Sequence, residues 1–301
     1  MKVLIAGGTG LIGSALADSL QDDGHQVAIL TRNPAKVSPG FRVVSWEEND
    51  LVGAVSQMDA IVNLAGESLA GGNPLLMRWT KKRKARILTS RMEVGANLLD
   101  AIQKAEPRPT TLVQASAIGY YGNQGEEAAD EGTPMGSDFL AQVCLDWEGS
   151  TREVEQLGIR RVVIRIGLVL SQKGGLLPLL SLPFRLFVGG RLGSGRQTMS
   201  WIHIDDIIGA VKYLLLHPET QGVYNLTAPE PVTNSIFAQT LGKTLQRTAW
   251  FPVPAFALKL LLGDASTLAL DGRQVLPGRL QRTTFQFHYP ELAPALNNLL
   301  A

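Results

Sequence analysis

The chain has very little cysteine, little net charge and no long apolar run. Cys144 is the only cysteine among 301 residues, which excludes an intramolecular disulfide framework and any zinc site built from several cysteines. The formal net charge is +1, so no overall field attracts nucleic acid or an anionic membrane. The most apolar stretch, residues 176–190, contains two prolines and an arginine and lacks the about 20 apolar residues that span a bilayer.

The N-terminus also lacks the charged and then apolar pattern of a signal peptide, because Lys2 to Ala6 runs directly into glycines. We therefore expect a cytoplasmic protein in a reducing compartment, with no nucleic-acid or membrane partner. The acidic and basic residues are nearly balanced, and 45% of the chain is hydrophobic, which is typical of a compact globular protein.

Short β-rich apolar runs alternate with longer helical patterns through the first two thirds of the chain. This alternation predicts an α/β fold, a Rossmann-type doubly wound parallel sheet with helices on both faces. The expected strands are 3–6, 26–30, 42–46, 60–64, 111–116, 161–170, 201–204 and 222–227. We assign residues 1–170 plus 201–228 to a dinucleotide-binding domain, and residues 171–200 plus 229–301 to a smaller C-terminal α+β substrate lobe.

A glycine-rich loop follows the first expected strand and opens the first expected helix. Its spacing is Gly7-x-x-Gly10-x-x-Gly13, and glycines there permit a tight turn and a close approach of the backbone to a diphosphate. The N-terminus of the helix also directs unpaired N–H groups at the phosphates. The residues expected to contact a dinucleotide here are Gly7, Thr9, Gly10, Leu11, Ile12 and Gly13.

The end of the second expected strand indicates which dinucleotide is bound. NAD-binding forms of this fold carry a carboxylate about 20 residues beyond the glycines, where it holds the ribose 2′-hydroxyl. Here that place reads Thr31-Arg32-Asn33, and Arg32 lies nineteen residues after Gly13. A guanidinium suits a 2′-phosphate, so NADP(H) is favoured over NAD(H). The alternative is that Arg32 is a solvated charge in a loop that Pro34 marks.

Several further strings resemble the extended short-chain dehydrogenase/reductases over the whole chain. They include Asn63-Leu64-Ala65-Gly66-Glu67 and the run from Trp201 to Asp206. More narrowly, the chain resembles an NAD(P)-binding epimerase-like subfamily that has a C-terminal extension. The strings that carry this narrower resemblance are Arg78-Trp79-Thr80, Ser90-Arg91, Tyr120-Tyr121-Gly122, Cys144-x-x-Trp147-Glu148, Gly193-Ser194-Gly195-Arg196 and Leu276-Pro277.

The resemblance implies cofactor contacts beyond the glycine loop. Leu64 and Ala65, with Gly66, would line the adenosine and ribose, Arg91 would lie close to the cofactor, and Leu168 would pack near the nicotinamide. Arg86 is a further cofactor candidate.

The catalytic pattern of the superfamily is incomplete in this chain. The resemblance implies a proton relay of three residues. A tyrosine transfers the proton, a lysine four residues later lowers the pKa of that tyrosine, and a serine or threonine orients the substrate. Ser116 stands at the serine position, and it also belongs to the expected cofactor contacts. None of the five tyrosines has a lysine four residues later, and no lysine occurs between Lys104 and Lys173.

If Cys144-x-x-Trp147-Glu148 marks the active-site helix of the family, the tyrosine position falls near Asp138 and the lysine position near Gln142. The candidate catalytic residues are Ser116 and Tyr120 or Tyr121, as the polar groups that remain, and Asp138 as a substitute acid or base. Asp138 can act as a base only if burial raises its pKa; otherwise it caps a helix or is exposed.

Three functions remain open at this stage. The chain is an NADP-dependent oxidoreductase or epimerase acting on a small molecule, a non-catalytic module whose NADP(H) occupancy controls a partner, or a structural relic, which the intact glycine loop disfavours. A homodimer is left open as the oligomeric state. His203, two residues before Asp205 and Asp206, has no suitable third ligand nearby, so we expect no metal site and a capping role for one of the aspartates.

Overall fold

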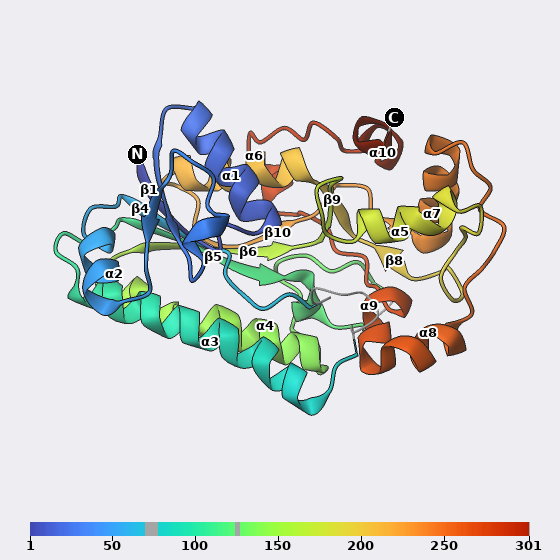
Figure 1. Ribbon diagram of the computed structural model, residues 1–301, viewed down its shortest axis with the longest axis horizontal. Helices are drawn as coiled ribbons and strands as arrows, with labels where there is room; N and C mark the ends of the chain where they lie inside the picture. The colour runs from blue at the N-terminus through green and yellow to red at the C-terminus, as the bar shows by residue number, and fades with distance from the viewer. Residues whose placement is uncertain (70–77, 124–126, 301) are drawn as a thin grey trace.

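The centre of the computed structural model is a seven-stranded sheet (Figure 1). The structure describes residues 1–69, 78–123 and 127–300. The strand order is β10-β6-β5-β4-β1-β2-β3, and all neighbouring strands are parallel. This arrangement confirms the predicted doubly wound α/β fold. The strands are β1 (Lys2–Ala6), β2 (Gln26–Leu30), β3 (Arg42–Val44), β4 (Ala60–Asn63), β5 (Thr111–Ala117), β6 (Arg160–Ile166) and β10 (Gly222–Leu226).

Helices cover both faces of the sheet because its strands are apolar on both sides. In β1, Val3 and Ile5 pack in one apolar cluster, whereas the alternate residues Leu4 and Ala6 pack in another. Helices α1 and α6 lie on the first face, and α2, α3 and α4 lie on the second (Figure 1). These helices are α1 (Leu11–Asp22), α2 (Glu48–Val55), α3 (Lys81–Lys104), α4 (Phe139–Gly149) and α6 (Ile204–Leu216).

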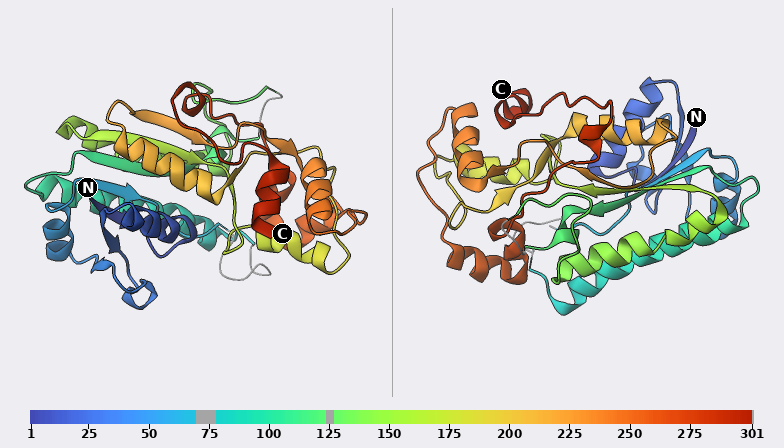
Figure 2. Two further views of the ribbon diagram at one scale, coloured as in Figure 1. Left: turned by 90° about the horizontal axis from the view of Figure 1, so that it is seen from above. Right: turned by 180° about the vertical axis from the view of Figure 1, so that it is seen from behind.

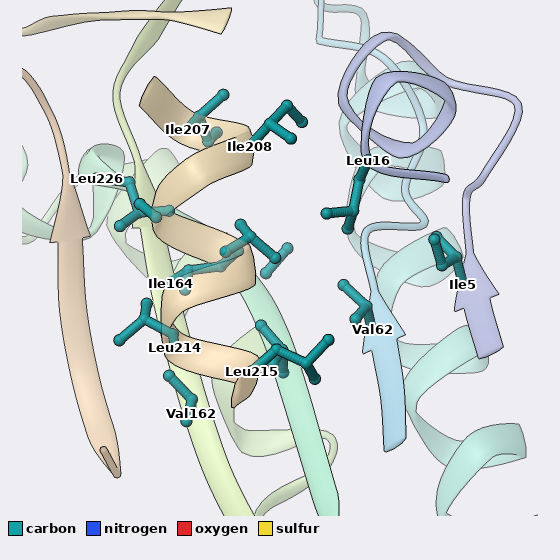
Figure 3. Packing of buried hydrophobic residues seen from close by; sticks show 14 of the residues in the cluster. Ile5, Leu16, Val62, Val162, Ile164, Ile207, Ile208, Leu214, Leu215 and Leu226 are labelled. Carbon is teal, nitrogen blue, oxygen red and sulfur yellow. The ribbon is translucent and has the colours of Figure 1, made fainter. Parts of the chain in front are cut away.

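The core on the α1 and α6 face joins residues that are distant in sequence. Figure 3 shows Ile207, Leu214 and Leu215 of α6 directed toward apolar side chains of the sheet, with Leu16 of α1 beside them. Complete burial of such side chains stabilises each by about 1.5–3 kcal/mol. This packing holds the carboxyl ends of the parallel strands at one common edge.

Short strand pairs and further helices lie outside the seven-stranded sheet (Figure 2). Strand β7 pairs with β9 in parallel, and β8 pairs with β11 antiparallel. These strands and helices are β7 (Leu168–Leu170), α5 (Leu177–Arg185), β8 (Thr198–Met199), β9 (Trp201–His203), β11 (Val232–Thr233), α7 (Asn234–Thr244), α8 (Ala255–Leu262), α9 (Thr267–Leu270) and α10 (Leu292–Leu300).

One expected strand is divided in two. We expected residues 161–170 to form a single strand, but β6 ends at Ile166 and β7 pairs within a different sheet. The break falls at Gly167, where an added Cβ would lie 2.5 Å from the carbonyl oxygen of Ser200. The close approach of the Ser200 backbone thus redirects the chain at a glycine.

The cap of α6 also differs from expectation. We predicted that Asp205 or Asp206 caps this helix, but the helix begins at Ile204 and Nδ1 of His203 accepts a hydrogen bond from the Asp205 N–H at 3.0 Å. Asp206 is buried and accepts the backbone N–H groups of His288 and Tyr289 instead. The described residues contain no metal-ligating group of three or more His, Cys, Asp or Glu side chains, and none of their helices could cross a bilayer.

Candidate cofactor and substrate site

The glycine loop between β1 and α1 is held by close backbone contacts. Gly7 has a φ of +84°, and an added Cβ there would lie 2.8 Å from the carbonyl carbon of Leu64. An added Cβ at Gly13 would lie only 2.3 Å from the carbonyl oxygen of Gly7. The same oxygen accepts a hydrogen bond from the Gly10 N–H at 3.0 Å. The loop can therefore approach the β4 end closely only because these positions lack side chains.

The N-terminus of α1 is open to an anion. Gly10 occupies the N-cap position without a side-chain cap, and the first turn contains no acidic residue. Thr9 and Gly10 are exposed, and Leu11 and Ile12 are half-buried. Because the first N–H groups of a helix lack internal partners and carry partial positive charge, they suit a diphosphate. The loop and this helix end fit the dinucleotide that the sequence predicts.

The end of β2 presents an unengaged cation at the same edge. Thr31 is buried, and its Oγ1 accepts the Asn33 N–H at 3.0 Å, which turns the chain. Arg32 and Asn33 are exposed. Within the described part of the chain, the Arg32 guanidinium forms no hydrogen bond or ion pair. It is therefore free to bind a 2′-phosphate.

The end of β4 lies over a buried arginine. Leu64 and Ala65 are half-buried, and Gly66 is exposed. An added Cβ at Gly66 would lie 3.1 Å from Cζ of Arg91. Arg91, on α3, is only 7% exposed, and burial is the largest cause that lowers its pKa. Residues Leu64 to Gly66 and Arg91 thus form a second wall at the carboxyl edge.

The Arg91 guanidinium is only partly satisfied. Its Nη1 donates to the Ile87 carbonyl oxygen at 2.9 Å, and its Cζ lies 4.6 Å from the ring centroid of Trp147. Its Nε is buried without a hydrogen-bond partner. A buried unpaired donor costs about 1–3 kcal/mol, so a ligand oxygen or water near Gly66 would stabilise this side chain. Arg86 is instead exposed and pairs with Glu67, with 2.7 Å between Nη2 and Oε1.

Ser116 lies inside a buried ion-pair cluster. It is 1% exposed, and its Oγ donates to Oε1 of Glu148 at 2.7 Å. Glu148 on α4 also accepts two bonds from Arg165 on β6, from Nε at 2.8 Å and from Nη2 at 2.9 Å. The hydroxyl of Ser116 is therefore committed to a carboxylate that neutralises a buried guanidinium.

The two candidate tyrosines occupy the other sides of Arg165. Tyr121 is fully buried; its hydroxyl donates to Oδ1 of Asn225 at 2.7 Å and accepts from Nη1 of Arg165 at 3.0 Å. Burial raises the pKa of Tyr121 to about 12. The half-buried Tyr120 ring stacks on Arg165, with 3.3 Å between Cζ and the ring centroid. This placement favours a structural role for Tyr121 over proton transfer at neutral pH.

Asp138 is the N-cap of α4. Its Oδ1 accepts the Ala141 N–H at 2.9 Å, and the residue is exposed. Gln142, at the expected lysine position, is also exposed, and its Nε2 donates to Oδ1 of Asp146 at 2.8 Å. Of the two expectations for Asp138, the structure agrees with the second: the residue caps a helix and is exposed, and it is not buried.

Two cavities lie where the segment that follows β5 meets the C-terminal residues 262–275. The larger, of about 570 Å³, is lined by Trp79, Asp138, Phe139 and other residues of this junction. The smaller, of about 180 Å³, includes Leu168, the residue that the family resemblance places near the nicotinamide. Figure 2 shows α8 and α9 beside the ends of α3 and α4. Asp138 and Leu168 are therefore the candidate site residues that reach the cavities.

Two residues near the site, Arg165 and Arg273, are not among the candidates that the sequence motifs indicate. Arg165 interrupts the otherwise apolar end of β6, and a charge within a buried strand is a signal for a partner elsewhere in the fold. Arg273 lines both cavities. It lies in an irregular segment without a local motif, so only the folded chain assigns it to the site.

Comparison with family models gives two matches that divide the chain. Residues 3–227 match the NAD dependent epimerase/dehydratase family. Residues 253–299 match a domain of unknown function, DUF1731. The second match coincides with the segment that supplies α8, α9 and α10.

Similar proteins cover the whole chain. It is 41% identical to the chloroplastic epimerase family protein SDR39U1 homolog of Arabidopsis thaliana, over 100% of this chain and 87% of that one. It is 36% identical to the epimerase family protein YfhF of Bacillus subtilis, over 100% of this chain and 98% of that one.

Solved structures agree with these relatives. A crystal structure of human epimerase family protein SDR39U1 with NADPH is 37% identical, with a TM-score of 0.90 and 99% coverage of both chains. The UDP-glucose 4-epimerase of Thermus thermophilus in complex with NAD is 17% identical, covers 99% of this chain and 97% of that one, and has a TM-score of 0.77. At that identity the second likeness shows the fold alone.

Proposed function

Because the chain belongs to the NAD dependent epimerase/dehydratase family, we propose that it binds NADP(H) in preference to NAD(H) and acts as an oxidoreductase or epimerase on a small molecule. The observation that carries the cofactor preference is Arg32, exposed and without a partner in the described residues at the end of β2, where NAD-binding forms of this fold hold a carboxylate. The NADPH bound by the similar human protein supports the same choice.

Different residues bind different parts of the cofactor. The N–H groups at the start of α1 bind the diphosphate, and Arg32 binds the 2′-phosphate through charge-assisted hydrogen bonds. Leu64 and Ala65 contact the adenosine side, and Arg91 offers its unpaired Nε beneath Gly66. Leu168 lines the adjoining cavity, so a substrate there meets the nicotinamide side. NADP(H), when bound, supplies or accepts the hydride.

The environments of the candidate catalytic residues favour a second function, a non-catalytic module whose NADP(H) occupancy controls a partner. The Ser116 hydroxyl is bound to Glu148, Tyr121 is buried, and Gln142 stands at the lysine position. The proton relay of the superfamily is therefore not assembled by these residues. Such a module binds NADPH tightly but does not oxidise it in single-turnover reactions with carbonyl compounds.

The cofactor proposal is tested by titrating the protein with NADPH and NADH and following cofactor fluorescence. Arg32→Ala removes a charged contact worth about 1.5–3 kcal/mol, so NADPH should bind about 10- to 150-fold more weakly. NADH affinity should change little. Arg152→Ala is the matched control. Arg152 is exposed on the segment that leads into the amino end of β6, whereas Arg32 follows the carboxyl end of β2.

Two outcomes would contradict the proposed specificity. Equal loss of NADPH and NADH affinity in Arg32→Ala would mean that Arg32 supports the loop rather than the 2′-phosphate. Unchanged affinity for both would mean that Arg32 is a solvated charge.

A further inference from the structure

The two cavities of the candidate site share one wall. Five residues line both of them: Ile118, Leu268, Asp271, Gly272 and Arg273. Four of these belong to the C-terminal segment that matches DUF1731. The larger cavity alone, at about 570 Å³, falls in the range of about 300–1,000 Å³ that holds small-molecule ligands.

The walls are mainly apolar. Trp79, Phe139 and Leu140 line the larger cavity, and the ring centroids of Trp79 and Phe139 lie 5.7 Å apart in an edge-to-face arrangement. Leu168, Leu180 and several other leucines line the smaller cavity. Such walls favour a ligand whose apolar surface is removed from water when it binds.

Three carboxylates among the described residues line the larger cavity, and one of them, Asp264, is paired with Lys84. Asp138 and Asp271 both line it, and neither forms an ion pair within the described residues. Burial is the largest cause that raises the pKa of Asp271; Lys259 opposes this rise, and the charge of Asp138 adds to it. Two carboxylates on one wall repel an anionic ligand.

Of the two described cations that line the same cavity, only Lys84 is neutralised by an ion pair. Nζ of Lys84 lies 2.6 Å from Oδ2 of Asp264. Nη1 of Arg273 donates to the Tyr121 carbonyl oxygen at 3.1 Å. The Nε of Arg273, however, is buried without a partner. One neutral oxygen of a ligand would satisfy this donor, whereas a diphosphate would need several free cations.

We propose that the paired cavities bind a predominantly apolar, uncharged carbonyl or hydroxyl compound, and that the carboxylates of Asp138 and Asp271 exclude the diphosphate of a sugar nucleotide. The assignment rests on the proposed function, since it places the substrate beside the NADP(H) edge. It gives the C-terminal segment a definite role: Leu268 and Asp271 select the substrate by polarity and charge.

The test compares three probes by isothermal titration calorimetry on the full chain saturated with NADP⁺. 2-Acetylnaphthalene is an uncharged aromatic ketone, 2-naphthoate is an anion of similar size, and UDP-glucose is a sugar nucleotide. We expect the ketone to bind at least tenfold more tightly than the naphthoate, and UDP-glucose to give no saturable heat. Tighter binding of naphthoate, or saturable binding of UDP-glucose with no binding of the ketone, would overturn the inference.

Variants locate the binding. Leu268→Glu places a charge in the shared wall and should weaken ketone binding at least tenfold. Leu260→Glu is the matched control, since Leu260 is 75% exposed on α8 and lines neither cavity. If Leu268→Glu does not fold, Phe139→Ala tests the larger cavity and should also weaken binding. Equal ketone affinity in these variants and the wild type would place the ketone elsewhere and refute the assignment.

A double variant tests the role of the two carboxylates. Asp138→Asn with Asp271→Asn removes both carboxylates, and asparagine still caps α4. The preference for ketone over naphthoate should then narrow, and an unchanged preference would refute the role of the carboxylates. The Arg32 titration is independent of these ketone measurements. Normal NADPH binding with no ketone binding would refute this inference alone. Loss of cofactor specificity with normal ketone binding would refute the proposed function alone.

Discussion

Gly13→Ala should disturb the glycine loop through one steric contact. The added Cβ would lie 2.3 Å from the carbonyl oxygen of Gly7 and 2.8 Å from Cα of Gly8. Non-bonded carbon atoms have their optimum separation at about 3.5–4.0 Å, so the turn or the start of α1 has to shift by roughly 1 Å. The atoms met are backbone atoms, which cannot rotate away as a flexible side chain would.

The magnitude follows from comparing two helical glycines. Overpacking of this kind costs about 1–3 kcal/mol, whereas replacement of a helical glycine by alanine by itself gains about 0.5–1 kcal/mol. Gly53, within α2, has nothing within 4 Å of its added Cβ. Gly53→Ala should therefore stabilise the protein, and the difference in unfolding free energy between the two variants isolates the cost of the contact.

Urea unfolding of both variants measures that difference, and NADPH titration measures its effect on the site. We expect Gly13→Ala to be less stable than Gly53→Ala by about 1–3 kcal/mol and to bind NADPH at least tenfold more weakly. Gly53→Ala should retain the wild-type affinity. If Gly13→Ala is as stable as Gly53→Ala and binds NADPH normally, the loop is not closely packed and the cofactor argument from its geometry fails.

Two further predictions concern the buried interior. Glu148→Ala leaves Arg165 buried without its bidentate partner and should lower the free energy of unfolding, measured in urea, by about 3–5 kcal/mol. The double variant Glu148→Leu with Arg165→Met should lose much less stability, because it leaves no buried charge unpaired. Equal losses in the two variants would refute the importance of the pairing. Cys144 is 3% exposed, and burial is the largest cause that raises its thiol pKa to about 11. Because only the thiolate reacts, Ellman's reagent at pH 8 should modify it about 100-fold more slowly in the native than in the unfolded protein, and a fast native reaction would contradict its burial.

The fold was predictable because its signals are local. Apolar runs with helical spacing between them identify the sheet, and β1, β2 and β10 lie at or within one residue of the expected ranges. The broken strand at Gly167 was not predictable, because its cause is the backbone of Ser200, which approaches from a distant part of the chain. The family resemblance read from the motifs is confirmed by the matches to the epimerase/dehydratase family and to DUF1731.

The candidate catalytic residues show the limit of motif reading most clearly. Ser116 stands at the position that the family pattern assigns to it, yet its hydroxyl bonds Glu148, thirty-two residues away in sequence. Tyr121 was selected as a polar group that remains although the Tyr-x-x-x-Lys pair is missing. Burial beside Arg165 gives it a structural environment. The sequence contains every member of this cluster but not the pairings among them.

The sequence by itself determined the glycine loop, the position of Arg32 and the absence of a Tyr-x-x-x-Lys pair, since each depends on residues close together in the chain. Only the tertiary structure decided which polar groups have hydrogen-bond partners and which side chains line the cavities. The wall that joins Ile118 and Asp138 to Leu268 and Asp271 exists because the C-terminal helices pack against the end of the α3 and α4 layer. Burial and contact between distant segments determine the charge and polarity of a site, and these arise only when the chain is folded.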